Sequence, residues 1–179
     1  IFTSSGSESN NMALKGCLGA GDHFITSSYE HPSILKVRPY LEKLGVEFSL
    51  VKPDKNGIVQ LESVLQEIQK NTRLISIMYV NNELGTINPI SEIAQLSHEK
   101  TILFHSDAVQ ALGKISLNMN DIPADFLSMS AHKLYGPKGV GALFIRKGTA
   151  LKPLIVGGGQ EANLRASTEN IAGIGGFGM

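Results

Sequence analysis

The sequence predicts one α/β domain whose sheet is mostly parallel and is covered by helices on both faces. Short runs rich in β-branched and aromatic residues recur along the chain, as is typical of strands. Between most of these runs the spacing of apolar residues changes to the helical period. Strands that alternate with helices form right-handed βαβ units, and such units build parallel sheets with helices on both faces.

Six runs have the composition and length expected of strands. They cover residues 23–28, 46–51, 73–80, 101–106, 125–130 and 140–145. The chain contains no internal repeat, so residues 1–179 are expected to form a single domain.

Between residues 61 and 70, apolar residues recur at positions i, i+3, i+4 and i+7, which predicts a crossover helix. These residues are Leu61, Val64, Leu65 and Ile68.

A second helix is predicted from Pro32 to Leu44. Pro32 suits the first position of a helix, and Gly45 suits the position just after its end. Pro39 lies inside this stretch, where it would remove a backbone hydrogen bond and kink the helix.

The composition is that of a soluble protein without an excess of charge. Hydrophobic residues make up 42% of the chain, and 16 basic side chains balance 16 acidic ones. Charge therefore gives no argument for binding to nucleic acid or to a membrane, and the apolar stretches are too short to cross a bilayer. Cys17 is the single cysteine, and no Cys/His spacing suggests a metal site. We expect a cytoplasmic protein.

Both ends of the chain look like cuts rather than natural boundaries. The first residue is Ile1, no signal-peptide pattern follows it, and residues 171–179 form a glycine-rich run. Residues 1–179 are therefore expected to be one incomplete domain.

In parallel α/β sheets, ligands bind beyond the carboxyl ends of the strands. Residues 3–11, TSSGSESNN, follow a short strand and precede a helix that contains Met12. Small residues, serine hydroxyls and the free N–H groups of a helix start can hold a phosphate. The alternative is a serine N-cap without a ligand, which is common. These residues contain neither a Walker A motif nor the GxGxxG pattern of the commonest nucleotide sites.

Two further strands are followed by polar residues. His31 lies just after one strand and at the start of a helix, where a histidine usually caps the helix or faces solvent. Asn82 and Glu83 follow another strand, where a side-chain amide can orient a ring substituent or simply form a turn.

The last two strand ends carry a carboxylate and an amine. Asp107 precedes Gln110, and a carboxylate in that place stays ionised if it faces a cationic nitrogen, such as the pyridinium of pyridoxal phosphate. Its alternative role is a helix N-cap. Lys133 follows another strand, where it either reacts with an aldehyde or remains an ordinary surface lysine. A phosphate cradle, a carboxylate, a hydroxyl and a lysine at strand ends together match the groups that bind pyridoxal phosphate.

Six ordered motifs resemble those of the cysteine desulfurases of iron–sulfur cluster assembly. They are TSSGSESNN (3–11), SSYEHPS (27–33), VNNELG (80–85), HSDAVQALGK (105–114), SAHKLYGPKG (130–139) and GGGQEANLRASTEN (157–170). The resemblance covers the whole chain and is shared by the related selenocysteine lyases. It implies membership of the class V aminotransferases and the large domain of fold type I pyridoxal phosphate enzymes.

The resemblance implies a role for each matching residue. Lys133 would attach pyridoxal 5′-phosphate, and His31 would stack on its ring and assist proton transfer. Asp107 would pair with the ring nitrogen, while Gln110 and Asn82 would reach the phenolic oxygen.

The phosphate would be held by Gly6, Ser7, Ser130 and His132 through the same resemblance. Thr168 would reach the phosphate bound by the partner subunit, which implies a homodimer with shared sites.

The chain departs from the family's pattern at several positions. Ser7 stands where threonine is usual and keeps the hydroxyl group, and Ala131 replaces a glycine. Near the expected dimer contact, Ala162 and Asn163 stand where an Arg–Gly pair is common, and Ser167 replaces another glycine.

The family's sulfur-accepting cysteine and its substrate-binding arginine lie beyond residue 179, as does the small carboxyl-terminal domain. Cys17 falls in the first helix and is expected to be a buried structural residue. Neither Arg146 nor Arg165 is expected to bind the substrate. The chain alone is therefore expected to be inactive.

The activity that the resemblance implies is removal of sulfur from L-cysteine, which gives L-alanine. The sulfur would pass to an enzyme cysteine and then to an iron–sulfur scaffold or another acceptor protein. The alternatives are a selenocysteine lyase and a non-catalytic fragment that binds the cofactor.

Overall fold

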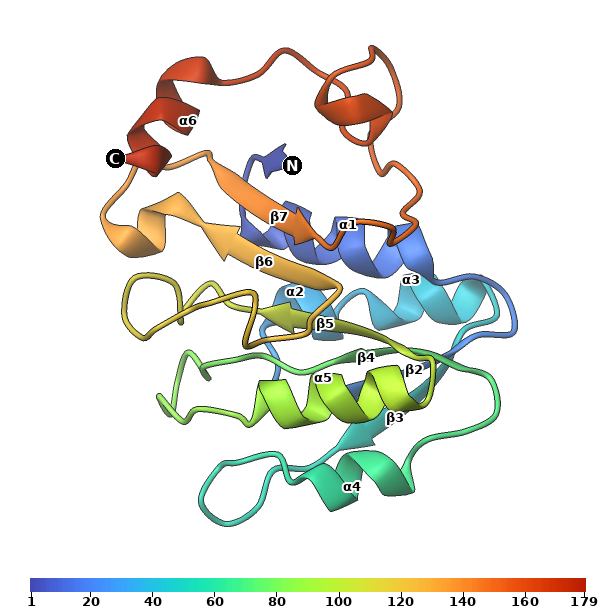
Figure 1. Ribbon diagram of the computed structural model, residues 1–179. Helices are drawn as coiled ribbons and strands as arrows, with labels where there is room; N and C mark the ends of the chain where they lie inside the picture. Colours follow the sequence, from blue (N-terminus) through green and yellow to red (C-terminus); the bar gives the residue numbers. More distant parts are fainter.

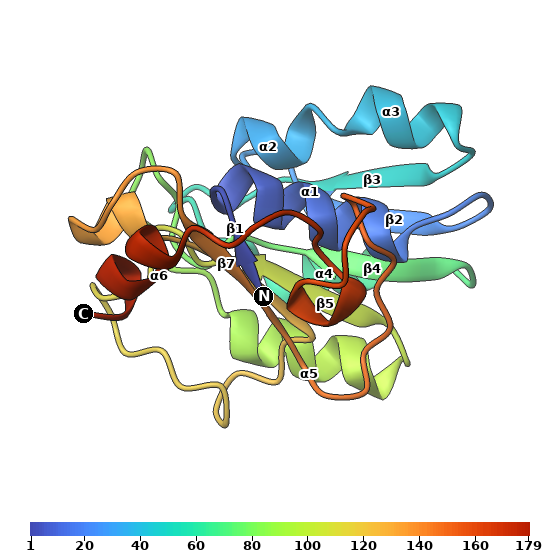
Figure 2. The same ribbon diagram turned by 90° about the horizontal axis from the view of Figure 1, so that it is seen from above.

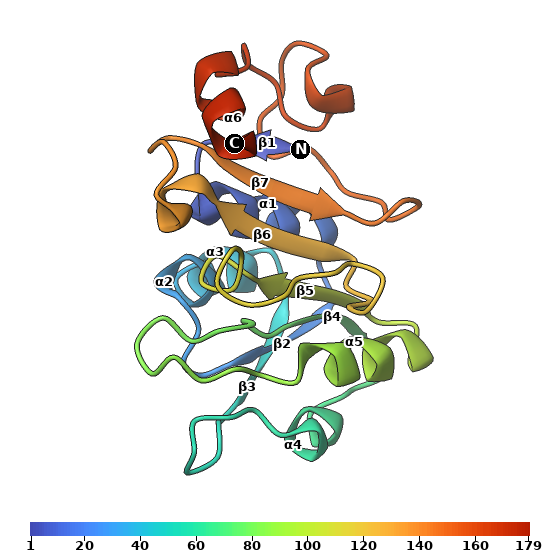
Figure 3. The same ribbon diagram turned by 60° about the vertical axis from the view of Figure 1, so that its left-hand side comes forward.

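The computed structural model describes residues 1–179, which form a seven-stranded sheet with helices on both sides (Figure 1). The strands are β1 (Phe2–Thr3), β2 (His23–Ser27), β3 (Glu47–Val51), β4 (Thr72–Ser76), β5 (Leu103–Asp107), β6 (Phe126–Ser130) and β7 (Gly141–Ile145). Their order in the sheet is β1-β7-β6-β5-β4-β2-β3 (Figure 3). Strands β2 to β6 pair in parallel, whereas β7 is antiparallel to both of its neighbours. The mostly parallel α/β sheet expected from the sequence is confirmed.

The helices form a layer on each face of the sheet (Figure 2). One layer contains α1 (Gly6–Cys17), α2 (Pro32–Leu35) and α3 (Arg38–Lys43), and the other contains α4 (Leu61–Gln66) and α5 (Ile90–Glu99). The remaining helices are η1 (Ala131–Leu134), η2 (Glu161–Asn163) and α6 (Ile171–Gly178), and α6 lies beyond the β1 edge of the sheet. None of these helices combines the length and apolar character needed to span a bilayer.

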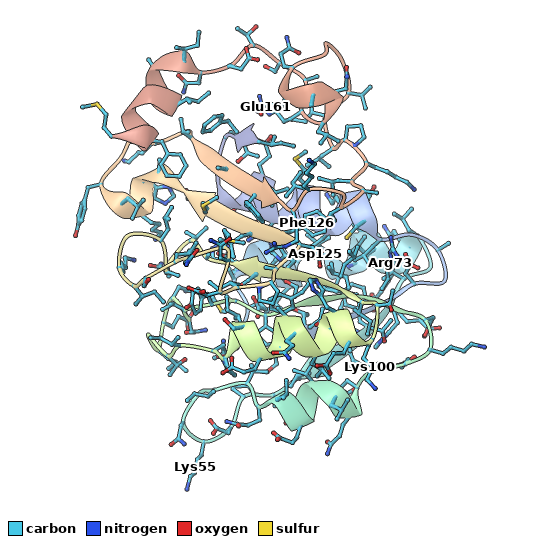
Figure 4. The ribbon with its side chains drawn as sticks, in the orientation of Figure 1. Lys55, Arg73, Lys100, Asp125, Phe126 and Glu161 are labelled. Atoms are coloured by element: carbon cyan, nitrogen blue, oxygen red, sulfur yellow. The ribbon has the colours of Figure 1, made fainter.

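Two hydrophobic cores hold the sheet between its helical layers. Neighbouring residues of a strand face opposite sides, so Phe24 and Leu74 pack with α1 to α3 while Ile25 and Ile75 pack with α4 and α5. All four side chains are fully buried. Phe126, at the start of β6, lies in the middle of the molecule (Figure 4). Packing on both faces fixes the positions of the strand ends.

The helix expected over residues 61–70 is shorter, because α4 ends at Gln66. The hydroxyl of Thr72, at the start of β4, accepts the backbone N–H of Gln69 at 2.8 Å and stabilises a turn there. Ile68 still packs against the core. Ile68 therefore fits the helical spacing of apolar residues because it packs in the core, although it lies beyond the end of α4.

The helix expected from Pro32 to Leu44 is divided into α2 and α3. Pro39 lies in the first turn of α3, where the backbone nitrogen needs no helical partner. The proline thus begins a new helix instead of kinking a continuous one.

The strand expected over residues 73–80 begins at Thr72 and ends at Ser76, which pairs with Thr26 of β2. Beyond that point the N–H of Met78 donates to a carboxylate oxygen of Glu30 at 2.9 Å. The same oxygen accepts the hydroxyl of Ser27 at the end of β2. A side chain thus replaces the missing backbone partner and ties β2 to β4.

Glu30 is nearly inaccessible to solvent, with 4% of its surface exposed, and its second carboxylate oxygen has no partner. Burial raises the pKa of Glu30 from 4.5 to about 8, although its hydrogen bonds to Ser27 and Met78 oppose this shift. Burial therefore favours the neutral form of Glu30 near pH 7.

Residues 161–167 contain strained backbone. Glu161, Ala162 and Asn163 have φ angles of 47°, 56° and 65°, and Ser167 has 111°. The last value lies in a region that L-residues other than glycine rarely adopt. Glu161 marks this loop, which lies beyond β7 (Figure 4). Asn163 and Ser167 stand at the two positions where the family that the sequence resembles commonly has glycine. Their positive φ angles explain why glycine is common there.

Replacing Ser167 with glycine should stabilise the protein by about 1 kcal/mol, because the strain at φ 111° is relieved and the exposed side chain buries little surface. Urea denaturation would measure the change. The matched control is Ser63→Gly within α4, which should destabilise the protein because glycine weakens a helix interior. A loss of stability in Ser167→Gly would contradict the assignment of strain.

Replacing Glu30 with glutamine should flatten the pH dependence of stability. In the wild type, the raised pKa means that unfolding releases a proton between pH 4.5 and about 8. The free energy of unfolding therefore falls as the pH rises, by at most about 1.4 kcal/mol per pH unit. Glutamine keeps the accepting oxygen and removes the titration. Denaturation at pH 5 and pH 8 would show this, whereas the exposed Glu62→Gln variant should keep the wild-type slope.

Candidate functional site

A cavity of about 370 Å³ lies at the edge of the sheet where β1, β2, β5 and β6 end. This volume is within the usual range for sites that bind small molecules. Its walls include nine of the ten residues to which the resemblance assigns a role at the cofactor. They are Gly6, Ser7, His31, Asn82, Asp107, Gln110, Ser130, His132 and Lys133.

One wall of the cavity has the features of an anion site. Ser5 caps α1 by accepting the backbone N–H of Glu8 at 3.2 Å, so the N–H groups of Gly6 and Ser7 start the helix without helical acceptors. A Cβ atom at Gly6 would lie 2.5 Å from a methyl group of Val109, so only glycine lets α1 approach the turn after β5 this closely. The serine N-cap considered from the sequence is real, and it leaves the helix start available for an anion.

The end of β6 adds polar groups to the cavity. The Ser130 hydroxyl lies 2.9 Å from Nδ1 of His132, which fixes the orientation of the imidazole ring. Both side chains line the cavity together with Gly6 and Ser7. Hydroxyl, imidazole and backbone N–H groups of this kind can hold a phosphate.

Asp107 is the buried carboxylate of the site, with 5% of its surface exposed. Its Oδ1 accepts the N–H of Val109 at 3.0 Å, and its Oδ2 accepts the side-chain amide of Asn10 at 2.7 Å. Burial raises the pKa of Asp107, while these hydrogen bonds and the nearby His31 oppose the shift. A cation in the cavity would favour the ionised form. Residues 109–113 form turns, so Asp107 is not the N-cap of an α-helix.

His31 caps α2 and lines the cavity at the same time. Its Nδ1 accepts the backbone N–H of Ser33 at 3.1 Å and lies 2.7 Å from the Ser33 hydroxyl. Because Nδ1 acts as an acceptor, the neutral ring carries its proton on Nε2. The capping role considered from the sequence therefore favours this tautomer of the histidine.

Lys133 and Gln110 lie on segments that follow β6 and β5. Lys133 belongs to η1, directly after the last residue of β6, and its side chain is exposed at the cavity. The Gln110 carbonyl oxygen accepts a hydrogen bond from Lys114 at 2.5 Å. The amide nitrogen of Gln110 therefore remains available to donate to an oxygen atom of a ligand.

Thr168 is not brought into this cavity. It lines a separate, smaller cavity of about 160 Å³ together with Arg165 and Glu161. Its expected contact with a partner subunit stays a prediction.

Arg165 forms an ion pair with Glu8, with Nε 2.8 Å from Oε1. Burial works against ionisation of Glu8, but its hydrogen bonds with Arg165 and Ser4 outweigh that effect and lower its pKa. The pair ties the loop that carries Thr168 to the first turn of α1.

Cys17 lies in α1, as expected, and lines neither of these two cavities. Its thiol donates to the backbone oxygen of Ala13 at 2.9 Å. Burial raises the pKa of this thiol to about 12, so it is not a reactive thiolate at neutral pH.

Sequence reasoning did not assign roles to Asn10 and Ser33, which also line the cavity. Asn10 follows Gly6 by four residues, so both lie on the same buried face of α1. That spacing was the available signal for Asn10. Ser33 lies two residues after His31, but its contact with Asn10 joins segments that are distant in the sequence.

Comparisons with known proteins agree with this geometry. The family model described as aminotransferase class V matches residues 1–179. The chain is 53% identical to "Cysteine desulfurase IscS" of Dictyoglomus turgidum, covering 99% of this chain and 46% of that protein. The chain thus spans about half the length of the curated relatives it matches.

Solved structures give the same result. A structure titled "NIFS-LIKE PROTEIN" superposes with a TM-score of 0.94 at 41% identity, covering 99% of this chain and 50% of the other. Another, titled "SspA in complex with cysteine", has a TM-score of 0.92 at 41% identity and covers 99% and 53%. Since the family model matches from the first residue to the last, this chain belongs to the class V aminotransferase family.

Proposed function

We propose that this chain is the pyridoxal phosphate-binding part of a cysteine desulfurase. The observation that carries the proposal is one cavity that joins a helix start suited to phosphate, a buried carboxylate and a lysine. Its similarity to curated cysteine desulfurases over 99% of its length supports the same reaction. The complete activity belongs to a polypeptide of those relatives' full length.

The residues of the cavity fit pyridoxal 5′-phosphate. Gly6, Ser7, Ser130 and His132 would hold the phosphate group, and Lys133 would attach the cofactor covalently. A pyridinium nitrogen would supply the cation that the buried carboxylate of Asp107 otherwise lacks.

The polar groups around the ring have complementary tasks. Asp107 would keep the ring nitrogen protonated. His31 would stack on the ring and present its Nε2 proton, and Gln110 and Asn82 would donate to the phenolic oxygen. The bound cofactor supplies an electron sink for the carbon from which the substrate loses its proton.

L-Cysteine is the proposed substrate, L-alanine the product, and a cysteine of the full-length enzyme the first sulfur acceptor. A structural neighbour bound to cysteine supports this substrate class. A cytoplasmic homodimer, in which Thr168 reaches the partner's phosphate, and an iron–sulfur scaffold or other acceptor protein complete the proposal.

Lys133→Ala should abolish covalent cofactor attachment. Wild-type protein incubated with pyridoxal phosphate should gain visible absorbance, and borohydride reduction with peptide mapping should place the pyridoxyl group on Lys133. In the full-length enzyme, the variant should also lose cysteine-dependent alanine production by several orders of magnitude, because it lacks the attaching amine.

The matched control is Lys138→Ala, which removes an exposed lysine from the same segment. It should keep both the absorbance and the activity. A pyridoxyl group found on any other lysine in the wild type would contradict the assignment of Lys133.

A further inference from the structure

Asn10 connects two polar groups that line the cavity. Its side-chain nitrogen lies 2.7 Å from Oδ2 of Asp107 and 2.8 Å from the hydroxyl of Ser33. Asn10 is 1% exposed, so water does not compete for these contacts. The two hydrogens of one amide group therefore serve two different partners.

The orientation of this amide follows from the chemistry of its partners. A carboxylate oxygen of Asp107 only accepts, so the amide nitrogen of Asn10 must face it. The amide oxygen of Asn10 is then buried without a partner. The unpartnered oxygen costs free energy, but this orientation directs both N–H groups of the amide to acceptors, Asp107 and Ser33.

The contact with Asn10 sets the direction of the next hydrogen bond. Because the Ser33 hydroxyl accepts from Asn10, its own hydrogen is free to point at Nδ1 of His31, 2.7 Å away. The same Nδ1 accepts the backbone N–H of Ser33. Hydrogen bonds thus run in one direction from Asn10 through Ser33 to His31.

We propose that Asn10 is a positioning residue that couples Asp107 to His31. One amide hydrogen holds the Asp107 carboxylate, and the other orients the Ser33 hydroxyl so that the neutral His31 ring keeps its proton on Nε2. The consequence of this coupling for catalysis rests on the proposed function. The hydrogen-bond chain itself is a property of the cofactor-free protein.

A purely structural role for Asn10 would consist of holding α1 against α2. That role predicts a loss of stability in Asn10→Ala without a specific change at His31. The tautomer of His31 therefore separates the two roles, and nitrogen-15 NMR of the imidazole ring reports it directly in the cofactor-free protein.

In Asn10→Ala, the Ser33 hydroxyl loses its donor and becomes free to accept from His31. The fraction of His31 that carries its proton on Nδ1 should rise roughly fivefold, as expected for one lost hydrogen bond. The carboxyl of Asp107, followed by carbon-13 NMR, should also titrate at a higher pH than in wild type. The wild type and the variant share the same other titratable residues, including Glu30, His132 and Lys133. The effect of these residues on Asp107 therefore cancels when the two proteins are compared.

Ser33→Ala separates the two arms of the chain. It should raise the fraction of His31 that carries its proton on Nδ1 by a similar factor, while the titration of Asp107 keeps its wild-type midpoint. Ser33→Thr restores a hydroxyl group and should restore the wild-type tautomer. These variants decide the His31 arm even if Asn10→Ala proves too unstable to fold.

Asn11→Ala is the matched control, because Asn11 donates to the backbone oxygens of Ser7 and Ser33 at 3.0 and 3.4 Å. It should leave both His31 and Asp107 unchanged. The proposal is overturned if folded Asn10→Ala or Ser33→Ala has the same His31 tautomer population as Asn11→Ala.

The loaded protein provides a second readout. In Asn10→Ala, the pH dependence of the visible absorbance of bound pyridoxal phosphate should differ from that in Asn11→Ala. Failure of all variants and the wild type to bind the cofactor would refute the proposed function. The NMR result would still decide whether Asn10 couples the two side chains.

Discussion

The site depends on a carboxylate that is excluded from water. Asp107 ends the central strand β5, and a charge in that position requires hydrogen-bond donors at short distance. Val109 supplies one from the turn after the strand, and Asn10 supplies the other from α1. The contact with Asn10 ties α1 to the end of β5. The absence of a side chain at Gly6 makes this close approach possible.

The rest of the fold holds these donors in place. Cores on both faces of the sheet fix the strand ends, and Glu30 joins the ends of β2 and β4 with a neutral carboxyl group. Burial and the charge of Asp107 both raise the pKa of Glu30, which favours its neutral form. Asp107 is the only carboxylate among the residues that line the cavity, and a cation bound there would favour its ionised form.

The sequence predicted those parts of the structure that depend on local patterns. Strand positions followed from apolar runs, and the rule that ligands bind beyond strand ends pointed to the segments that line the cavity. The resemblance to a known family then assigned roles to individual residues within these segments. The helix α5 was not predicted individually, although Ile90, Ile93 and Ala94 have helical spacing. Its signal was present and local.

Other features depend on contacts between distant segments, which no local pattern reveals. The hydroxyl of Thr72 stabilises the turn after α4, and Glu30 replaces a backbone partner beyond the end of β4. The reversed direction of β7 was likewise not apparent from its composition. The roles of Asn10 and Ser33 arise only when α1, α2 and β5 come together.

The central role of Asp107 is tested most directly by Asp107→Asn in the full-length enzyme saturated with cofactor. A neutral amide keeps the shape of the side chain but cannot hold a positive charge on a ring nitrogen. Turnover of L-cysteine should fall by at least two orders of magnitude, while the affinity for pyridoxal phosphate should change much less because the phosphate contacts remain. The exposed Asp121→Asn variant should behave as wild type. Near-normal turnover by the cofactor-saturated Asp107→Asn enzyme would contradict the role assigned to the buried carboxylate.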